Sequence, residues 1–80
     1  MNKSYIIIQC SNYFEYMNFK DKLQSIRIAC KLFDSTYTFK LPGINHSLTF
    51  MAILNTYAPT ANITQVSFRN GRAIYTKLKD

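Results

Sequence analysis

Near its end the chain reads Val66-Ser67-Phe68-Arg69-Asn70-Gly71-Arg72-Ala73-Ile74-Tyr75, in which an Asn-Gly pair separates two alternating runs. Asn-Gly favours a type I′ turn, because both central residues of that turn need a positive φ. The predicted hairpin pairs Arg69 with Arg72, Phe68 with Ala73 and Val66 with Tyr75. Like charges that stand opposite each other destabilise a hairpin, by up to roughly 1 kcal/mol. We therefore interpret the two arginines as a basic tip for an acidic partner.

The composition bounds the fold and the class of partner. The 80 residues predict a single domain, 1–80, and their apolar share of 48% with a charged share of 18% indicates an ordered globule. Ten lysines and arginines against four acids give a formal net charge of +6. That charge favours an anionic partner, which is nucleic acid, an acidic protein surface or an anionic membrane surface, although net charge also serves solubility.

Upstream of the hairpin, the chain predicts a strand and a long helix. The β-branched run within 5–10 indicates a central strand, and Asn12 with Glu15 forms a capping box for a helix. Apolar residues then recur at spacings of three and four over about five turns, as one stripe that packs on the sheet. The stripe consists of Tyr16, Phe19, Leu23, Ile26, Cys30 and Phe33. A coiled-coil seam is the alternative interpretation of this stripe.

The middle of the chain predicts a second strand and a second helix. Residues 36–41 alternate as a half-buried strand, and Pro42-Gly43 forms a turn. Asn45 or Ser47 caps the second helix, which is apolar nearly all round and ends before Pro59. A domain of this size buries such a helix only in part, so we expect an exposed strip that marks an interface. That strip is Phe50, Leu54 and Tyr57.

The resulting order is β-α-β-α-β-β. It predicts the α+β class, with two helices packed on one face of a mostly antiparallel sheet of about four strands.

Catalytic and metal chemistry find little support in these residues. His46 is the single histidine, and no partner stands at a spacing that indicates a general base. Cys10 and Cys30 form no CxxC pair and are expected to be reduced, buried thiols without a metal. We therefore expect a non-enzymatic protein without a cofactor. A small toxin ribonuclease that uses His46 and the arginines is a third alternative.

The candidate binding residues are basic and aromatic. The first set lies on the hairpin and the tail and consists of Arg69, Arg72, Tyr75, Lys77 and Lys79. The second is a basic face of the first predicted helix and consists of Lys20, Arg27 and Lys31. Aromatic and basic residues also alternate at Tyr37, Phe39 and Lys40, as in sheets that stack the bases of single strands. Direct binding of single-stranded DNA or RNA is thus an alternative function.

Parts of the chain resemble small proteins of phages and mobile elements, including some anti-CRISPR proteins. The resemblance lies in the opening Tyr5-Ile6-Ile7 strand and in a helix followed by the 66–75 hairpin. It implies an inhibitor that binds a host protein or nucleoprotein complex, such as a CRISPR effector, on an acidic or nucleic-acid-contacting surface. The apolar run at 5–8 is too short for a signal peptide or membrane span, so a cytoplasmic location is expected. A homodimer is also possible on the sequence alone.

Overall fold

The computed structural model describes residues 4–42 and 48–78. The elements in chain order are β1 (Tyr5–Gln9), α1 (Tyr13–Ser25), β2 (Lys31–Phe33), the 3-10 turn η1 (Asp34–Thr36), β3 (Thr38–Pro42), α2 (Leu48–Tyr57), β4 (Asn62–Arg69) and β5 (Arg72–Lys77). The five strands form one antiparallel sheet in the order β2-β3-β1-β4-β5. The predicted α+β class is confirmed. The prediction of about four strands is wrong, because β2 adds a fifth strand at one edge.

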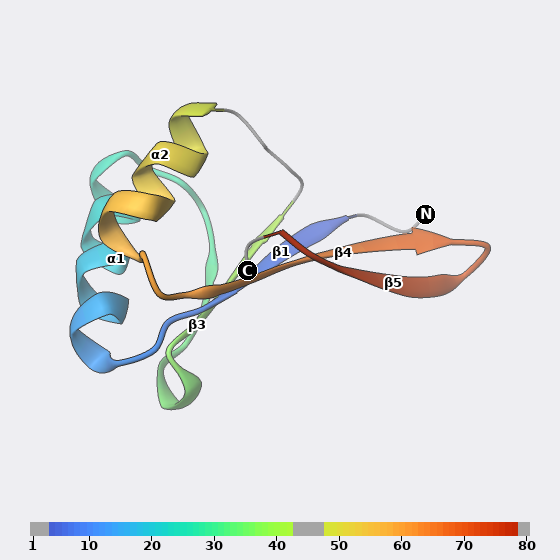
Figure 1. Ribbon diagram of the computed structural model, residues 1–80, viewed down its shortest axis with the longest axis horizontal. Helices are drawn as coiled ribbons and strands as arrows, with labels where there is room; N and C mark the ends of the chain where they lie inside the picture. The colour runs from blue at the N-terminus through green and yellow to red at the C-terminus, as the bar shows by residue number, and fades with distance from the viewer. Residues whose placement is uncertain (1–3, 43–47, 79–80) are drawn as a thin grey trace.

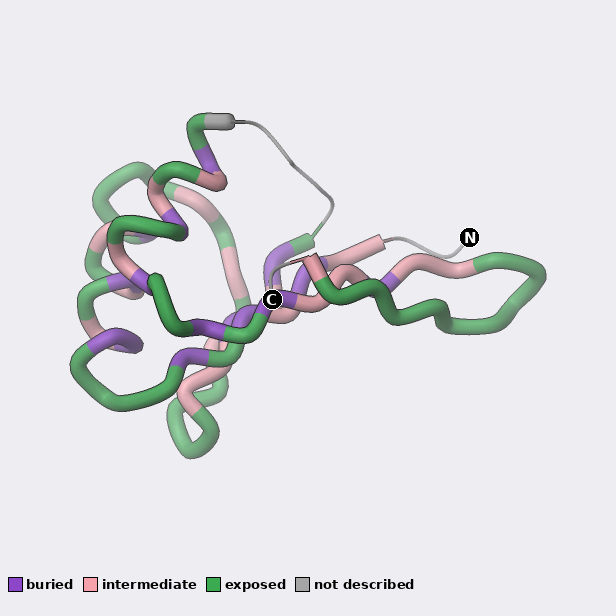
Figure 2. The backbone as a smooth tube through the Cα atoms, viewed as in Figure 1, coloured by how far each residue is buried: buried purple, intermediate pink, exposed green. Residues whose placement is uncertain are grey.

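Both helices lie on the same face of the sheet, and the β4–β5 hairpin projects beyond them (Figure 1). Alternation along the strands turns one set of apolar side chains toward the helices. These are Ile6 and Ile8 of β1, Phe39 and Leu41 of β3, and Ile63 of β4. They form a single buried core with side chains from α1 and α2, and Figure 2 marks the buried positions along the backbone. None of the described helices has the length and apolar character needed to cross a membrane.

Helix α1 begins at the predicted cap, with one difference. The side chain of Asn12 accepts a hydrogen bond from the Glu15 amide at 2.9 Å, as a capping box requires. The Glu15 carboxylate, however, accepts from the amide of Ser11, one residue before the cap. Its second oxygen accepts from the amide and the hydroxyl of Thr60, at 3.0 and 2.7 Å. The buried carboxylate thereby ties the start of α1 to the segment that follows α2.

The long helical stripe is correct for its first half and wrong for its second. Tyr16, Phe19 and Leu23 are buried under the sheet, but α1 ends at Ser25 and Arg27 adopts a left-handed φ of 59°. The chain then extends, because Leu32 pairs with Phe39 as β2 joins β3. Ile26, Cys30 and Phe33 therefore do not continue the helix: they lie at its C-cap, in the following loop and in β2, respectively.

Two further sequence expectations are corrected. The predicted strand 36–41 begins later, at Thr38, because 34–36 form η1 and Tyr37 adopts a left-handed φ of 53°. The predicted exposed strip on α2 is wrong: Phe50 is 7% and Leu54 0% exposed, because both pack into the core, and Tyr57 is half-buried. The helix does end before Pro59, at Tyr57. Gly43 of the predicted turn and the predicted caps Asn45 and Ser47 lie in 43–47, outside the described residues.

The terminal hairpin has the predicted turn and register. Asn70 and Gly71 have φ values of 52° and 77°, as a type I′ turn requires. Arg69 stands opposite Arg72, and Val66 stands opposite Tyr75. All six residues of β5 are exposed, since this strand forms the free edge of the sheet beyond the helices. The hairpin therefore presents two open faces and an open edge.

Candidate nucleic-acid interface

The sheet face that points away from the helices, here called the helix-free face, collects aromatic and basic side chains. The alternation that sends Ile6 and Ile8 into the core sends the intervening residues of each strand to this face. The register of the five strands places there Tyr5 and Ile7 of β1, Lys31 and Phe33 of β2, Lys40 of β3, Val66 and Phe68 of β4, and Tyr75 and Lys77 of β5. These side chains come from all five strands.

An aromatic row, which consists of Tyr5, Phe68 and Tyr75 around Val66, crosses the middle of the helix-free face. Val66 stands between Tyr5 on β1 and Tyr75 on β5 in the strand register. Although no helix lies over it, Val66 is 0% exposed, while Tyr75 is 67% exposed. The ring centroids of Tyr5 and Phe68 lie 6.1 Å apart. The row thus presents aromatic rings to solvent, with the buried Val66 packed between them.

A lysine row, which consists of Lys31, Lys40 and Lys77, runs beside the aromatic row. Lys31 stands opposite Lys40, Lys40 opposite Ile7, Ile7 opposite Thr64 and Thr64 opposite Lys77, so the row crosses all five strands. The ammonium of Lys40 lies 4.2 Å from the centroid of the Tyr5 ring. None of the described strands carries an aspartate or glutamate. This face therefore has an uncompensated positive charge.

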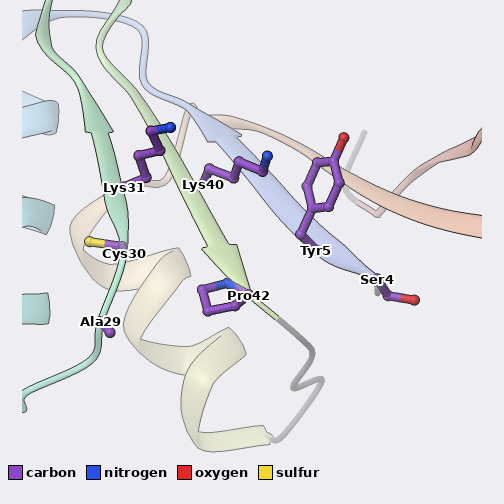
Figure 3. Close-up of a pocket in the computed structure, with 7 residues that line it drawn as sticks. All are labelled: Ser4, Tyr5, Ala29, Cys30, Lys31, Lys40 and Pro42. Carbon is purple, nitrogen blue, oxygen red and sulfur yellow. The ribbon is translucent and has the colours of Figure 1, made fainter. Parts of the chain in front are cut away.

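A hollow of about 460 Å³ lies at the β2 end of the two rows. Its lining includes Tyr5, Lys31, Lys40 and Pro42, and Figure 3 shows the Lys40 side chain directed toward the Tyr5 ring. Cys30 also lines it, but its sulfur points away from Lys40 and Tyr5 in this view. A cavity of this size is within the range of about 300–1,000 Å³ typical of small-molecule sites.

The structure divides the predicted hairpin set between the two faces. Tyr75 and Lys77 belong to the helix-free face. Arg69 and Arg72 are opposite each other one residue further along the strands than a pair on that face, so their side chains point to the other face at the hairpin tip. Lys79 lies outside the described residues. The hairpin thus offers an aromatic-basic face and a separate basic tip.

The predicted second patch is not a single helix face. Lys20 lies on α1, Arg27 follows the helix and Lys31 belongs to β2, because the helix ends earlier than its apolar stripe indicated. Lys20 instead places its ammonium 5.9 Å from the Tyr16 ring. Of the three, Lys31 joins the lysine row.

Of the predicted stacking strand, Lys40 lies on the helix-free face. Phe39 is 0% exposed in the core, so its ring is not available to a base, and Tyr37 packs beside Tyr13 and Tyr16 in the turn before β3. The sequence reasoning missed Tyr5 as a site residue. Alternation along the first strand places Tyr5 on the same face as Ile7, and this was visible in the sequence. That Val66 and Lys40 are its neighbours follows only from the strand order.

Burial shifts the pKa values of both thiols and of one tyrosine among the described residues. Burial, with a smaller effect from the charge of Glu15, raises the pKa of the Cys10 thiol to about 12. Burial also raises the pKa of Cys30, and the nearby Lys20 opposes part of that rise. Burial and then the hydrogen bond to Asp34 raise the pKa of the Tyr16 hydroxyl well above its ordinary value. In 4–42 and 48–78, no three His, Cys, Asp or Glu side chains gather as metal ligands. His46 lies outside these ranges.

Comparison of the chain with protein-family models, curated proteins and solved structures gives no match. The functional argument therefore rests on the geometry of the helix-free face.

Proposed function

We propose that this protein is a non-enzymatic binding protein that takes up single-stranded DNA or RNA on the helix-free face. The observation that supports this proposal is the juxtaposition of the aromatic row on β1, β4 and β5 with the lysine row that crosses all five strands. Proteins that bind single strands combine aromatic platforms for the bases with cations that follow the backbone. The two rows supply these two parts side by side.

The single-stranded form of the ligand follows from the aromatic residues. Tyr75 is 67% exposed and stands on the edge strand β5, where its ring is open to stacking. A duplex keeps its bases stacked on each other, whereas unpaired bases are free to stack on protein rings. The contacts involve base faces and phosphates, so the binding should have little sequence preference.

The alternative is an inhibitor that occupies an acidic or nucleic-acid-contacting surface of a host nucleoprotein complex, with a CRISPR effector of a phage host as the specific case. The basic tip favours this alternative, because Arg69 and Arg72 stand side by side at the end of a projecting hairpin (Figure 1). Such a partner would contact the tip, whereas a nucleic acid strand would contact the helix-free face.

The experiment is fluorescence anisotropy with labelled single-stranded oligonucleotides and matched duplexes over a range of salt concentrations. We expect tighter binding of the single strand. The triple variant Lys31→Gln, Lys40→Gln and Lys77→Gln should flatten the salt dependence by about two units of slope, since each phosphate contact with a single strand contributes about 0.7.

The matched pair for stacking is Tyr75→Ala and Ile74→Ala. The two residues are neighbours on β5, both are exposed, and they point to opposite faces. Loss of a stacking ring should weaken single-strand binding by about 1–3 kcal/mol, and Ile74→Ala should leave it nearly unchanged. Equal effects of the two variants, or no binding of any single strand, would overturn the proposal.

A further inference from the structure

The hollow at the β2 end of the helix-free face holds two lysines that repel each other. Lys31 stands directly opposite Lys40 in the strand register, and both line the hollow (Figure 3). Like charges in directly opposed positions destabilise a strand pair. No described strand carries an acid, and the ammonium groups of Lys31 and Lys40 lie beside the rings of Phe33 and Tyr5, respectively. A bound anion would remove the repulsion.

The position of the hollow distinguishes it from the rest of the lysine row. Lys77 stands alone on β5, whereas Lys31 and Lys40 are adjacent, on strands about 4.8 Å apart. β2 is the edge of the sheet, so the row ends here. A nucleic acid backbone that follows the row has no further strand to cross beyond this point.

The two charges also indicate which kind of phosphate fits. An internal phosphodiester carries one negative charge, whereas a terminal phosphomonoester carries about −1.5 to −2 at neutral pH. Two lysines at directly opposed positions of neighbouring strands match the second. Tyr5 and Pro42 supply an aromatic and an aliphatic wall next to them, and these suit the sugar and base of the same nucleotide.

On the basis of the proposed single-strand binding, we infer that the hollow between Lys31, Lys40 and Tyr5 is an end site that holds the terminal phosphate of the strand. The strand runs from the hollow along the two rows toward Tyr75 and Lys77. The protein then prefers phosphorylated ends to internal positions. A comparison of 5′-phosphorylated and 3′-phosphorylated oligonucleotides shows which end the site holds.

The test compares three forms of one short labelled oligonucleotide in anisotropy: unphosphorylated, 5′-phosphorylated and 3′-phosphorylated. One of the phosphorylated forms should bind about tenfold more tightly, the ratio expected of one charge-assisted contact at a partly exposed site. Adenosine monophosphate should compete with that form more strongly than adenosine does.

The variants are Lys31→Gln and Lys40→Gln, with Lys22→Gln as the matched control. Lys22 is a lysine of α1 that lies beside the Tyr57 ring, away from the hollow. The readout is the ratio of affinities for the phosphorylated and unphosphorylated forms, which corrects for any general loss of binding. The ratio should fall to about one in both hollow variants and stay unchanged in the control. Circular dichroism should show each variant folded, since either change relieves the lysine repulsion.

Three results would count against the end site, and they have two different meanings. Equal binding of all three forms by the unmodified protein would overturn the end site and leave single-strand binding intact. A phosphate preference that survives both hollow variants would likewise overturn it. Absence of binding to every oligonucleotide would overturn the proposed function and the end site together.

Discussion

The buried side chain of Glu15 ties the start of α1 to the segment that follows α2 through hydrogen bonds. It accepts bonds from the Ser11 amide, the Thr60 amide and the Thr60 hydroxyl. Removing this charged acceptor takes it away from both amides, while the Thr60 hydroxyl keeps its hydrogen bond to the Ser11 hydroxyl. The sequence indicated a local cap, but the bond to Thr60 crosses 45 positions and required the fold to be seen.

Glu15→Ala should lower the free energy of unfolding by about 2–3 kcal/mol, because hydrogen bonds to a charged group are worth roughly 1.5–3 kcal/mol each in net terms. Urea denaturation measures the change. Asp21→Ala, on the exposed side of the same helix, is the control and should stay within about 0.5 kcal/mol. An effect of Glu15→Ala no larger than that of the control would contradict a stabilising role.

The two thiols should differ in reactivity. The pKa of Cys10 near 12 keeps its sulfur protonated, so at pH 8 the reactive thiolate is roughly a thousandfold rarer than for a thiol of pKa 9.0. Cys10 is also buried, whereas Cys30 is half-buried. With Ellman's reagent, the Cys30→Ser variant should therefore react much more slowly than the Cys10→Ser variant. Its rate should rise only as the pH approaches 12 or the protein unfolds.

At the scale of elements, the end of α1 separates two halves of one apolar stripe. Leu23→Ala should cost about 2–5 kcal/mol of stability, because Leu23 is 0% exposed. Ile26→Ala should cost less than about 1 kcal/mol, since Ile26 is 37% exposed beyond the helix. Thermal and urea unfolding measure both. Similar losses would mean that the helix continues through Ile26.

The reason the sequence predicted this helix too long is physical. Cys30 and Phe33 keep the helical spacing, yet the chain gains more by pairing Leu32 with Phe39 at the sheet edge. Periodicity reports only which residues are apolar and how far apart they stand, so it does not register a strand partner further along the chain. The hairpin was predicted correctly because its turn, register and partner all lie within ten residues.

The same limit explains the candidate site. Tyr75 and Lys77 were identified from the hairpin alone, but their relation to Tyr5 and Lys40 depends on β1 lying between β3 and β4. Phe39 was assigned to base stacking because alternation does not say which of two faces receives the helices. Only the packing of α1 and α2 decides that Phe39 faces the core.

The basic tip separates the two candidate partners. Replacing Arg69 and Arg72 with serine removes a like-charge pair, so stability should be unchanged or slightly higher, by up to about 1 kcal/mol. Single-strand affinity should fall less than in Tyr75→Ala, because the tip points away from the helix-free face. A loss confined to a host protein partner, and concentrated in the off-rate, would favour the inhibitor alternative. Arg27→Ser is the charge control.

At the scale of the whole molecule, the free edge of β5 raises the question of self-association. Antiparallel pairing of β5 with its copy about Ile74 and Tyr75 would set Arg72 against Lys77 of the second copy. Charged edge residues of this kind oppose edge-to-edge pairing. We therefore expect a monomer in sedimentation velocity at moderate salt, and a stable dimer would show that another surface associates.

The hairpin that projects beyond the helices also predicts where the molecule opens first. The strand β5 bonds to a single neighbour, and all of its residues are exposed, whereas β1 lies between two strands under the core. Amide protons of β5 should therefore exchange with deuterated solvent by local fraying, long before those of β1, which wait for global unfolding. Since Tyr75 and Lys77 belong to this strand, a ligand on the helix-free face would slow that exchange. The protection of β5 amides then reports occupancy without any label on the ligand.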